Sequence, residues 1–196
     1  MVILPPVEVI EKLIDINRQA TAKNAAWGSL AKDDFLPHLS LAMGGVEYDN
    51  LEKVKNVIKD TISEFGAISI ELNELYFVER PDGSRNYCFR VKNTSVLQQL
   101  HEKLMNNLRP YFSYDCTKDS LFSKPGEEII VPDYLNKYLS SYSFNAFEPH
   151  ITLRTKEAVG QEYLPIKFIA NKVAVFHAGV MTTCRKEFFA VELARS

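Results

Sequence analysis

The spacing of apolar residues predicts three amphipathic helices in the first part of the chain. Apolar side chains recur every three or four positions over 7–25, 51–65 and 97–108, which is the period of one face of an α-helix. Residues that commonly begin or end helices flank each segment. The expected boundary residues are Pro5-Pro6 before the first helix, Asp49 or Asn50 before and Gly66 after the second, and Thr94 or Ser95 before and Arg109-Pro110 after the third.

Shorter apolar runs, several of them alternating with polar residues, predict β-strands between and after these helices. The sequence over 81–84, Pro-Asp-Gly-Ser, is a turn signal, so the strands on either side of it are expected to pair. Strands that alternate with helices and also pair with one another favour an α/β or α+β sandwich, formed here by a single domain over 1–196. The predicted strands cover 2–4, 35–43, 67–79, 87–91, 149–153, 166–176 and 188–193.

Residues 111–147 have no clear period and carry many aromatic side chains among Ser, Asn, Asp and Lys. One short helix is expected around 133–141. Long segments of this kind in a compact domain are often functional lids, and disorder is the alternative. We therefore interpret 111–147 as an aromatic-rich insertion that is mostly ordered loop, with a role that the sequence leaves open.

Composition and charge are those of an ordinary globular protein. The 196 residues are 46% hydrophobic and 24% charged, with a formal net charge of −2, so no strong overall field attracts nucleic acid or an anionic membrane. Cys88, Cys116 and Cys184 form an odd set without metal-site spacing, which favours free thiols in a reducing compartment. With no signal-peptide pattern and no membrane-length apolar stretch, we expect a cytoplasmic protein.

One five-residue pattern occurs twice in the chain. Residues 37–41 read Pro-His-Leu-Ser-Leu, and residues 149–153 read Pro-His-Ile-Thr-Leu. Because side chains alternate between the two faces of a strand, the histidine and the hydroxyl residue of each pattern are expected on one face. The apolar side chains would then anchor each strand in a core, and the polar pair would face a cleft. The predicted catalytic residues are His38, Ser40, His150 and Thr152.

These residue types are suited to cleaving a phosphodiester. An imidazole can accept or donate a proton near neutral pH, and a hydroxyl can donate a hydrogen bond to a phosphate oxygen. Where two such motifs face each other, one histidine deprotonates the attacking group and the other protonates the leaving oxygen, while the hydroxyls hold the phosphoryl group. The sequence does not say which histidine is the base and which is the acid.

Two other interpretations apply to histidines in such patterns. A single histidine in a strand is more often a hydrogen-bonded core residue, but a matched pair favours a shared site. A metal centre needs further ligands at characteristic spacing, and Ser and Thr are poor zinc ligands, so we expect no metal and no cofactor. His101 is predicted to be solvated on the polar face of its helix, and His177, which follows a predicted strand, is interpreted as structural.

At the two motifs the chain resembles the 2H phosphoesterase superfamily, which includes 2′,5′-RNA-ligase-like proteins and cyclic nucleotide phosphodiesterases. The opening Ile-Leu-Pro-Pro-Val over 3–7 also resembles the first strand and helix start of that family. The resemblance implies a two-lobed, pseudo-twofold α+β sandwich, with antiparallel sheets around a central cleft and helices on the outside. It also implies one motif from each lobe, with His38/Ser40 and His150/Thr152 facing a shared groove.

A basic residue often follows the second motif in the family, and Arg154 stands at that place here. By strand alternation Arg154 would share a face with His150 and Thr152, so it is the predicted substrate-binding residue, in contact with the phosphate. The alternative is that Arg154 forms only a surface salt bridge.

The predicted function is that of a metal-independent phosphodiesterase acting on a cyclic 2′,3′-type or a 2′,5′-linked nucleotide or RNA-end phosphodiester. The first alternative is an RNA 2′,5′-ligase or RNA 3′-end processing enzyme with the same histidines. The second is a non-catalytic nucleotide- or RNA-binding module, which is disfavoured because both histidines and both hydroxyls are present. The mildly acidic charge favours a nucleotide or short RNA over a long one. We expect a monomer without membrane partners.

Overall fold

A computed structural model describes residues 1–21, 29–79, 85–157 and 159–194 of the chain. Its eight strands form one sheet in the order β6-β3-β4-β5-β2-β1-β7-β8, with antiparallel pairing between all neighbours. The strands are β1 (Val2–Ile3), β2 (Leu39–Ser40), β3 (Ile68–Glu79), β4 (Arg85–Val91), β5 (His150–Thr152), β6 (Ile166–Ala170), β7 (Lys172–Ala178) and β8 (Cys184–Glu192). The α+β class is confirmed, and one curved sheet stands in place of the separate sheets of the expected sandwich.

The three predicted helices are confirmed, and two short ones follow. The Thr94 side chain caps the third helix by accepting a hydrogen bond from the Leu97 backbone N–H at 3.3 Å, as its sequence position predicts. Asn50 occupies the N-cap position of the second helix without a capping hydrogen bond from its side chain. The helices are α1 (Val7–Thr21), α2 (Leu51–Ser63), α3 (Ser95–Leu108), α4 (Asp133–Asn136) and α5 (Tyr138–Ser141).

Two predicted strands differ from the structure. The run over 35–43 contains only the two-residue strand β2, because the chain leaves the sheet on both sides of it. The run over 166–176 is two strands, β6 and β7, separated by Asn171. β6 pairs with β3 while β7 pairs with β1 and β8, so the single predicted strand is two strands with different partners. The predicted turn at 81–84 and the last residues of the first predicted helix lie outside the described residues.

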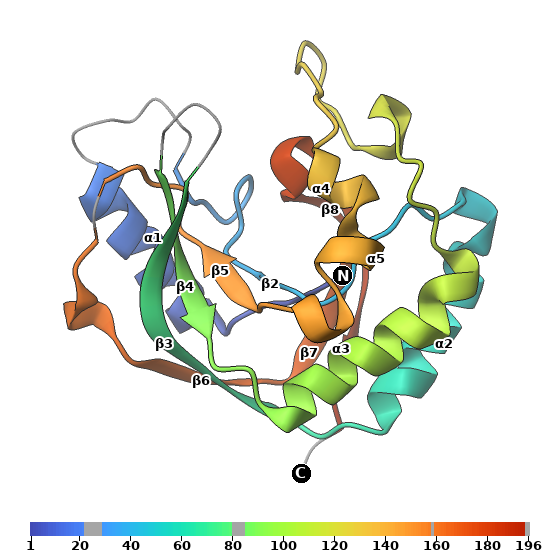
Figure 1. Ribbon diagram of the computed structural model, residues 1–196, viewed down its shortest axis with the longest axis horizontal. Coiled ribbons are helices and arrows are strands. Elements are labelled where there is room, and N and C mark those ends of the chain that lie inside the picture. The colour runs from blue at the N-terminus through green and yellow to red at the C-terminus, as the bar shows by residue number, and fades with distance from the viewer. Residues whose placement is uncertain (22–28, 80–84, 158, 195–196) are drawn as a thin grey trace.

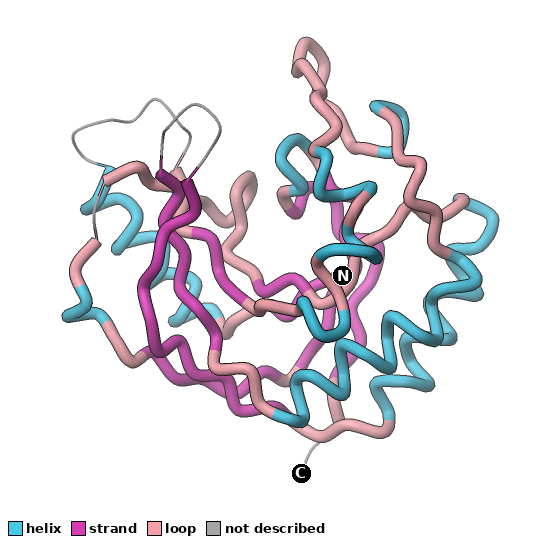
Figure 2. The backbone as a smooth tube through the Cα atoms, in the orientation of Figure 1, coloured by secondary structure: helices cyan, strands magenta, loops and turns pink. Residues whose placement is uncertain are grey.

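The sheet curves into a trough, and at one end of it the chain after the edge strand β8 is hydrogen-bonded to the connection between α2 and β3. Figures 1 and 2 show the trough open at the top of the view, with α1 on one side and α2 and α3 on the other. At the opposite end Ala67 donates its backbone N–H to the Ala194 carbonyl at 3.1 Å, and the Ala194 N–H reaches the Phe65 carbonyl at 3.1 Å. Gly66 lies in this junction, paired with Ala194, and α2 already ends at Ser63.

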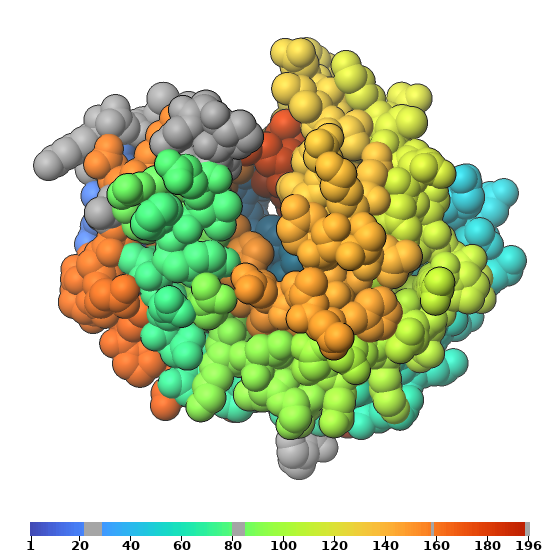
Figure 3. All heavy atoms as spheres, viewed as in Figure 1, coloured from blue at the N-terminus to red at the C-terminus, as the bar shows by residue number. Residues whose placement is uncertain are grey.

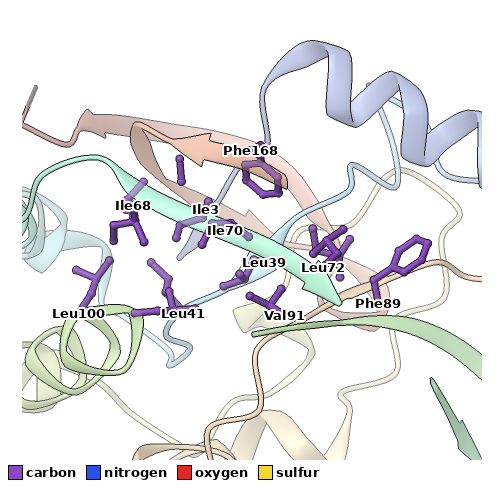
Figure 4. Packing of buried hydrophobic residues seen from close by; sticks show 14 of the residues in the cluster. Ile3, Leu39, Leu41, Ile68, Ile70, Leu72, Phe89, Val91, Leu100 and Phe168 are labelled. Carbon is purple, nitrogen blue, oxygen red and sulfur yellow. The ribbon is translucent and has the colours of Figure 1, made fainter. Parts of the chain in front are cut away.

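The helices α1, α2 and α3 pack on the sheet through one continuous apolar core, while α4 and α5 contribute to two smaller clusters. Ile3, Leu39 and Leu41 have no or almost no exposed surface and lie against side chains of β3, β4 and α3, as Figure 4 shows. Leu39 and Ile151, the middle residues of the two motifs, are both fully buried here. Removing apolar surface of this extent from water is the main force that holds the sheet and helices together. The motif strands are therefore anchored at the centre of the fold.

Residues 111–147 form an ordered wall against the sheet. Gly45 and Ser113 exchange two backbone hydrogen bonds of 2.8 and 2.9 Å, and the Phe122 N–H donates to the Ala178 carbonyl at 2.8 Å. A Cβ atom on Gly44 would lie 2.5 Å from the Phe112 ring, so the absence of a side chain there allows the close approach. Figure 3 shows a hollow between this wall and the opposite half of the molecule, with the blue N-terminal part of the chain at its bottom.

Candidate active site

The two motifs lie side by side at the centre of the sheet. β2 and β5 pair antiparallel, with Leu39 opposite Ile151. This register sets His38 across from Thr152 and Ser40 across from His150. Because the middle residues point into the core, all four polar side chains share the other face, where they are half-buried. Diagonal neighbours in such a pair lie about 7–8 Å apart, a separation that a phosphate group can bridge.

Both motif histidines are held in the same way by their own backbone. The His38 Nδ1 lies 2.7 Å from the Leu36 carbonyl oxygen, and the His150 Nδ1 lies 2.9 Å from the Glu148 carbonyl oxygen. A carbonyl oxygen can only accept, so each Nδ1 carries the proton and donates it. The Nε2 atom of each neutral ring is then the one with a lone pair. The arrangement leaves two Nε2 atoms for proton transfer.

The two histidines differ in their surroundings. Burial lowers the pKa of His38 from its ordinary 6.5 to about 4, against the raising effect of the hydrogen bond to Leu36, and the positive charges of the amino terminus and of His150 lower it further. His38 is therefore neutral at physiological pH and ready to accept a proton.

His38 and Ser40 also line a cavity of about 520 Å³. Its walls include the loop after β2, the aromatic-rich segment and the β7–β8 hairpin. A volume of this size lies within the range of small-molecule sites. Representative lining residues are Ala42, Phe112, Ser113, His177, Thr183 and Lys186.

Arg90 and Tyr76 lie next to His150, and neither residue was predicted from the sequence. Arg90 is directly opposite His150 in the β4–β5 pair, and its guanidinium lies 4.4 Å from the centre of the Tyr76 ring. The Tyr76 ring meets the His150 ring edge-on, with ring centres 6.4 Å apart. Alternation along β4 predicts that Cys88 and Arg90 point away from the face that carries its three core residues. It does not predict that Arg90 lies next to His150, because that depends on which strand pairs with β4.

Arg90 is fixed by two carboxylates. Its Nε lies 2.8 Å from the Glu74 carboxylate, and one terminal nitrogen lies 3.6 Å from that of Glu148. Burial raises the pKa of the Tyr76 hydroxyl, so this group stays protonated and can donate. The surface next to His150 is therefore formed by the Tyr76 ring and the Arg90 guanidinium stacked on it. With the two carboxylates included, this surface has a small net negative charge.

Arg154 does not continue the strand as alternation assumed. β5 ends at Thr152, and Arg154 has a positive φ of 52°, which places its side chain independently of the strand faces. Its guanidinium lies 3.6 Å from the centre of the Phe35 ring, and Nη1 lies 3.6 Å from the sulfur of Met181. Contact between Arg154 and a phosphate stays a prediction, now without support from alternation.

The expectations for the other two histidines need correction. His101 was predicted to be solvated, but it has no exposed surface, because the 138–147 segment covers that side of α3. His177 lies within β7 instead of after it, with its ring 5.8 Å from that of Phe122 and 5.6 Å from that of Phe188. It also lines the cavity that His38 and Ser40 line.

The cysteines lie in separate places. Cys88, Cys116 and Cys184 are buried and form no disulfide within the described residues, and the Cys88 sulfur lies 3.8 Å from the Thr152 hydroxyl oxygen. In the described part of the chain, no three side chains of His, Cys, Asp or Glu gather as a metal-binding set. Among the helices of the described residues, none combines the length and apolar character needed to cross a membrane.

Comparison with known proteins adds a family to this geometry. A search of curated proteins gave no significant match. The family model described as the 2′-5′ RNA ligase superfamily matches residues 17–176, which include both motifs and most of the sheet. The match covers well over half of the chain, and on this evidence the protein belongs to the 2′-5′ RNA ligase superfamily, the 2H phosphoesterase family.

Proposed function

We propose that this protein is a phosphodiesterase that cleaves a cyclic 2′,3′-type or 2′,5′-linked nucleotide phosphodiester by general acid–base catalysis without a metal. The observation that carries the proposal is the pairing of β2 with β5. This pairing brings two imidazoles with the same tautomer and two hydroxyls to one face of the sheet, which supports in-line displacement at phosphorus.

In the proposed step, His38 Nε2 takes a proton from the attacking water as its oxygen bonds to phosphorus. The bond from phosphorus to the leaving oxygen breaks, and His150, protonated at Nε2, gives its proton to that oxygen. The products are a phosphomonoester and a free hydroxyl group. His38 is assigned as the base because burial keeps it in the unprotonated form that can accept a proton. Exchange of protons with solvent then resets both rings.

Ser40 and Thr152 would hold the phosphoryl oxygens during this step. The register places each hydroxyl across from the histidine of the other motif, so the two donors lie on opposite corners of the site. Hydrogen bonds to oxygens that gain negative charge stabilise the transition state more than the ground state. Arg154 is retained as a further candidate phosphate contact.

The experiment that tests the proposal is a substrate panel in EDTA. It contains nucleoside 2′,3′-cyclic phosphates, 2′,5′-linked oligoadenylate and an RNA that ends in a 2′,3′-cyclic phosphate. We expect hydrolysis of at least one substrate at a rate that chelation does not change. Loss of activity in EDTA that a divalent ion restores would contradict the two-histidine mechanism. Joining of RNA ends in place of hydrolysis would favour the ligase alternative.

The pH dependence of kcat/KM should reveal the role of His38. The base must be unprotonated, and its pKa is lowered to about 4. Activity should therefore persist well below pH 6.5 and fall only as the pH drops through about 4, while the alkaline limb reports the acid. Steady-state kinetics from pH 3.5 to about 9, with folding checked by circular dichroism, measures this. An acid limb near 6.5 would mean that His38 is not the base.

We further infer that the nucleoside part of the substrate lies against Tyr76 and Arg90. A base can stack on an aromatic ring or a guanidinium plane. The surface around Arg90 offers hydrogen-bond donors from Arg90 and acceptors from Glu74 and Glu148, whose side chains are 53% and 69% exposed. Two carboxylates around one guanidinium would repel a second phosphate but suit the uncharged, hydrogen-bonding edge of a base.

Replacing Tyr76 with Leu should reduce kcat/KM for a nucleoside 2′,3′-cyclic phosphate by roughly 5- to 100-fold, because one stacking ring is lost. The same change should leave glycerol 1,2-cyclic phosphate, which has no base, unaffected. Tyr76→Phe should retain most of the preference for the nucleotide. Phe77→Leu is the matched control, because Phe77 is the next residue of β3 and is 43% exposed on the opposite face. Equal losses on both substrates would contradict a base subsite.

A further inference from the structure

Two buried polar side chains on the helices reach the backbone of both motifs. Asn17 on α1 has no exposed surface. Its Nδ2 donates to the Leu153 carbonyl, and its Oδ1 accepts from the Leu30 backbone N–H at 2.9 Å. Leu153 directly follows Thr152, and Leu30 lies in the segment that leads into His38. Asn17 therefore joins the end of the second motif to the approach to the first.

His101 on α3 makes the complementary connection. It is also fully buried. Its Nδ1–H donates to the Leu41 carbonyl at 2.6 Å, and its Nε2 accepts from the Phe144 backbone N–H at 2.8 Å. Leu41 directly follows Ser40, and Phe144 lies in the segment that leads into His150. His101 thus joins the end of the first motif to the approach to the second.

We propose that Asn17 and His101 are a matched pair of positioning residues that fix the two catalytic motifs relative to each other. Each side chain binds one carbonyl oxygen just after a catalytic hydroxyl residue and one N–H on the way to the other catalytic histidine. The two sets of hydrogen bonds cross between the motifs in opposite directions. The proposal rests on the proposed function, since it concerns the geometry of that site.

The chemistry of both side chains suits this task. An amide has a donor and an acceptor on one carbon, and a neutral imidazole has one of each on its ring. Burial lowers the pKa of His101, which keeps the ring neutral as the two bonds require. The Phe147 ring stacks flat on His101 with ring centres 3.9 Å apart, and the Tyr138 hydroxyl also donates to the Leu41 carbonyl at 3.3 Å. Both contacts limit movement of the imidazole.

A role in stability alone is the competing explanation. Buried polar groups without partners are costly, so loss of either side chain would destabilise any fold. Positioning makes a further demand, because a displacement of about 1 Å between catalytic groups can cost roughly 100-fold in rate. The two explanations differ in what happens to the molecules that remain folded.

The test compares four variants with a destabilised control. Asn17→Leu and His101→Leu each remove both hydrogen bonds of the replaced side chain. His101→Asn keeps a donor near the Nδ1 position for Leu41, and His101→Gln keeps an acceptor near the Nε2 position for Phe144. Each of these variants therefore loses one of the two hydrogen bonds. Leu104→Ala is the control, because Leu104 is fully buried one turn after His101 and the change opens a cavity in the core.

In the folded fraction, the two Leu variants should lose roughly 10- to 100-fold in kcat with little change in KM. The kcat values of His101→Asn and His101→Gln should fall between those of the Leu variants and wild type. Leu104→Ala should lose stability but keep kcat. If the Leu variants also keep kcat while losing stability as the control does, the positioning role is overturned.

A second measurement does not depend on turnover. The ring nitrogen resonances of His38 and His150 can be assigned by NMR from the corresponding alanine variants. They should shift in both Leu variants and stay in place in Leu104→Ala. Shifts without any hydrolysis by wild type would sustain the positioning pair and reject the proposed activity. Unchanged resonances in the Leu variants would reject the positioning pair itself.

Discussion

Replacing His38 or His150 with alanine should lower kcat/KM by at least roughly 10²–10⁴-fold, the contribution of one positioned proton donor or acceptor. The free energy of unfolding should change little in comparison, because both rings are half-buried at the cleft and the core contacts of the motifs come from Leu39 and Ile151. Steady-state kinetics on the best substrate of the panel, with thermal unfolding in parallel, measures both quantities.

The double variant sharpens this expectation. Because the two rings act on the same transition state, His38→Ala/His150→Ala should lose less than the product of the two single losses. His177→Ala is a matched control, since His177 lines the same cavity from β7 with its ring near two phenylalanine rings; its loss should be far smaller. A His38 or His150 variant that unfolds while its folded fraction keeps full turnover would identify that histidine as a core residue.

Removing either hydroxyl should have the second-largest effect. Ser40→Ala or Thr152→Ala deletes one phosphate donor but leaves both proton-transfer groups, so we expect a loss of roughly 10- to 1,000-fold, by analogy with single oxyanion donors. The loss should lie mainly in kcat, because the bond strengthens as charge develops on the phosphoryl oxygens.

Conservative exchanges provide the control for the hydroxyls. Ser40→Thr and Thr152→Ser keep the oxygen at the same Cβ and should retain most of the activity. The Cys88 sulfur, 3.8 Å from the Thr152 oxygen, is close enough that the Thr152 variants should also be checked for altered thiol reactivity. Full activity in both alanine variants, with normal folding, would remove the hydroxyls from the mechanism.

The sequence predicted the parts of the site that depend on local geometry. Alternation along a strand is a property of the backbone, so it correctly placed Leu39 and Ile151 in the core and the polar residues of each motif on the other face. The helices followed from their period for the same reason. Only pairing between strands that are distant in sequence, here β2 with β5, brings the two motifs together, and no local pattern encodes it.

Three other features of the site likewise depend on more than the local sequence pattern. His101 lies on the polar side of its helix by pattern and is buried because residues 138–147 cover it. Arg90 occupies the ordinary polar face of a strand and gains significance only from its neighbour His150. Arg154 was predicted from a strand that ends two residues earlier, where the backbone turns to a positive φ. In each case a tertiary contact, or the end of a strand, determined where the side chain lies.

The hydrogen bond from each catalytic ring to the carbonyl two residues before it has a consequence for how such a site can arise. Donor and acceptor lie within one short peptide, so a copied segment would bring a correctly oriented imidazole with it. Duplication of a single strand, followed by antiparallel pairing of the two copies, would then yield both halves of a proton-transfer system in one event. Later sequence divergence could alter every surrounding residue without disturbing the tautomer of either ring.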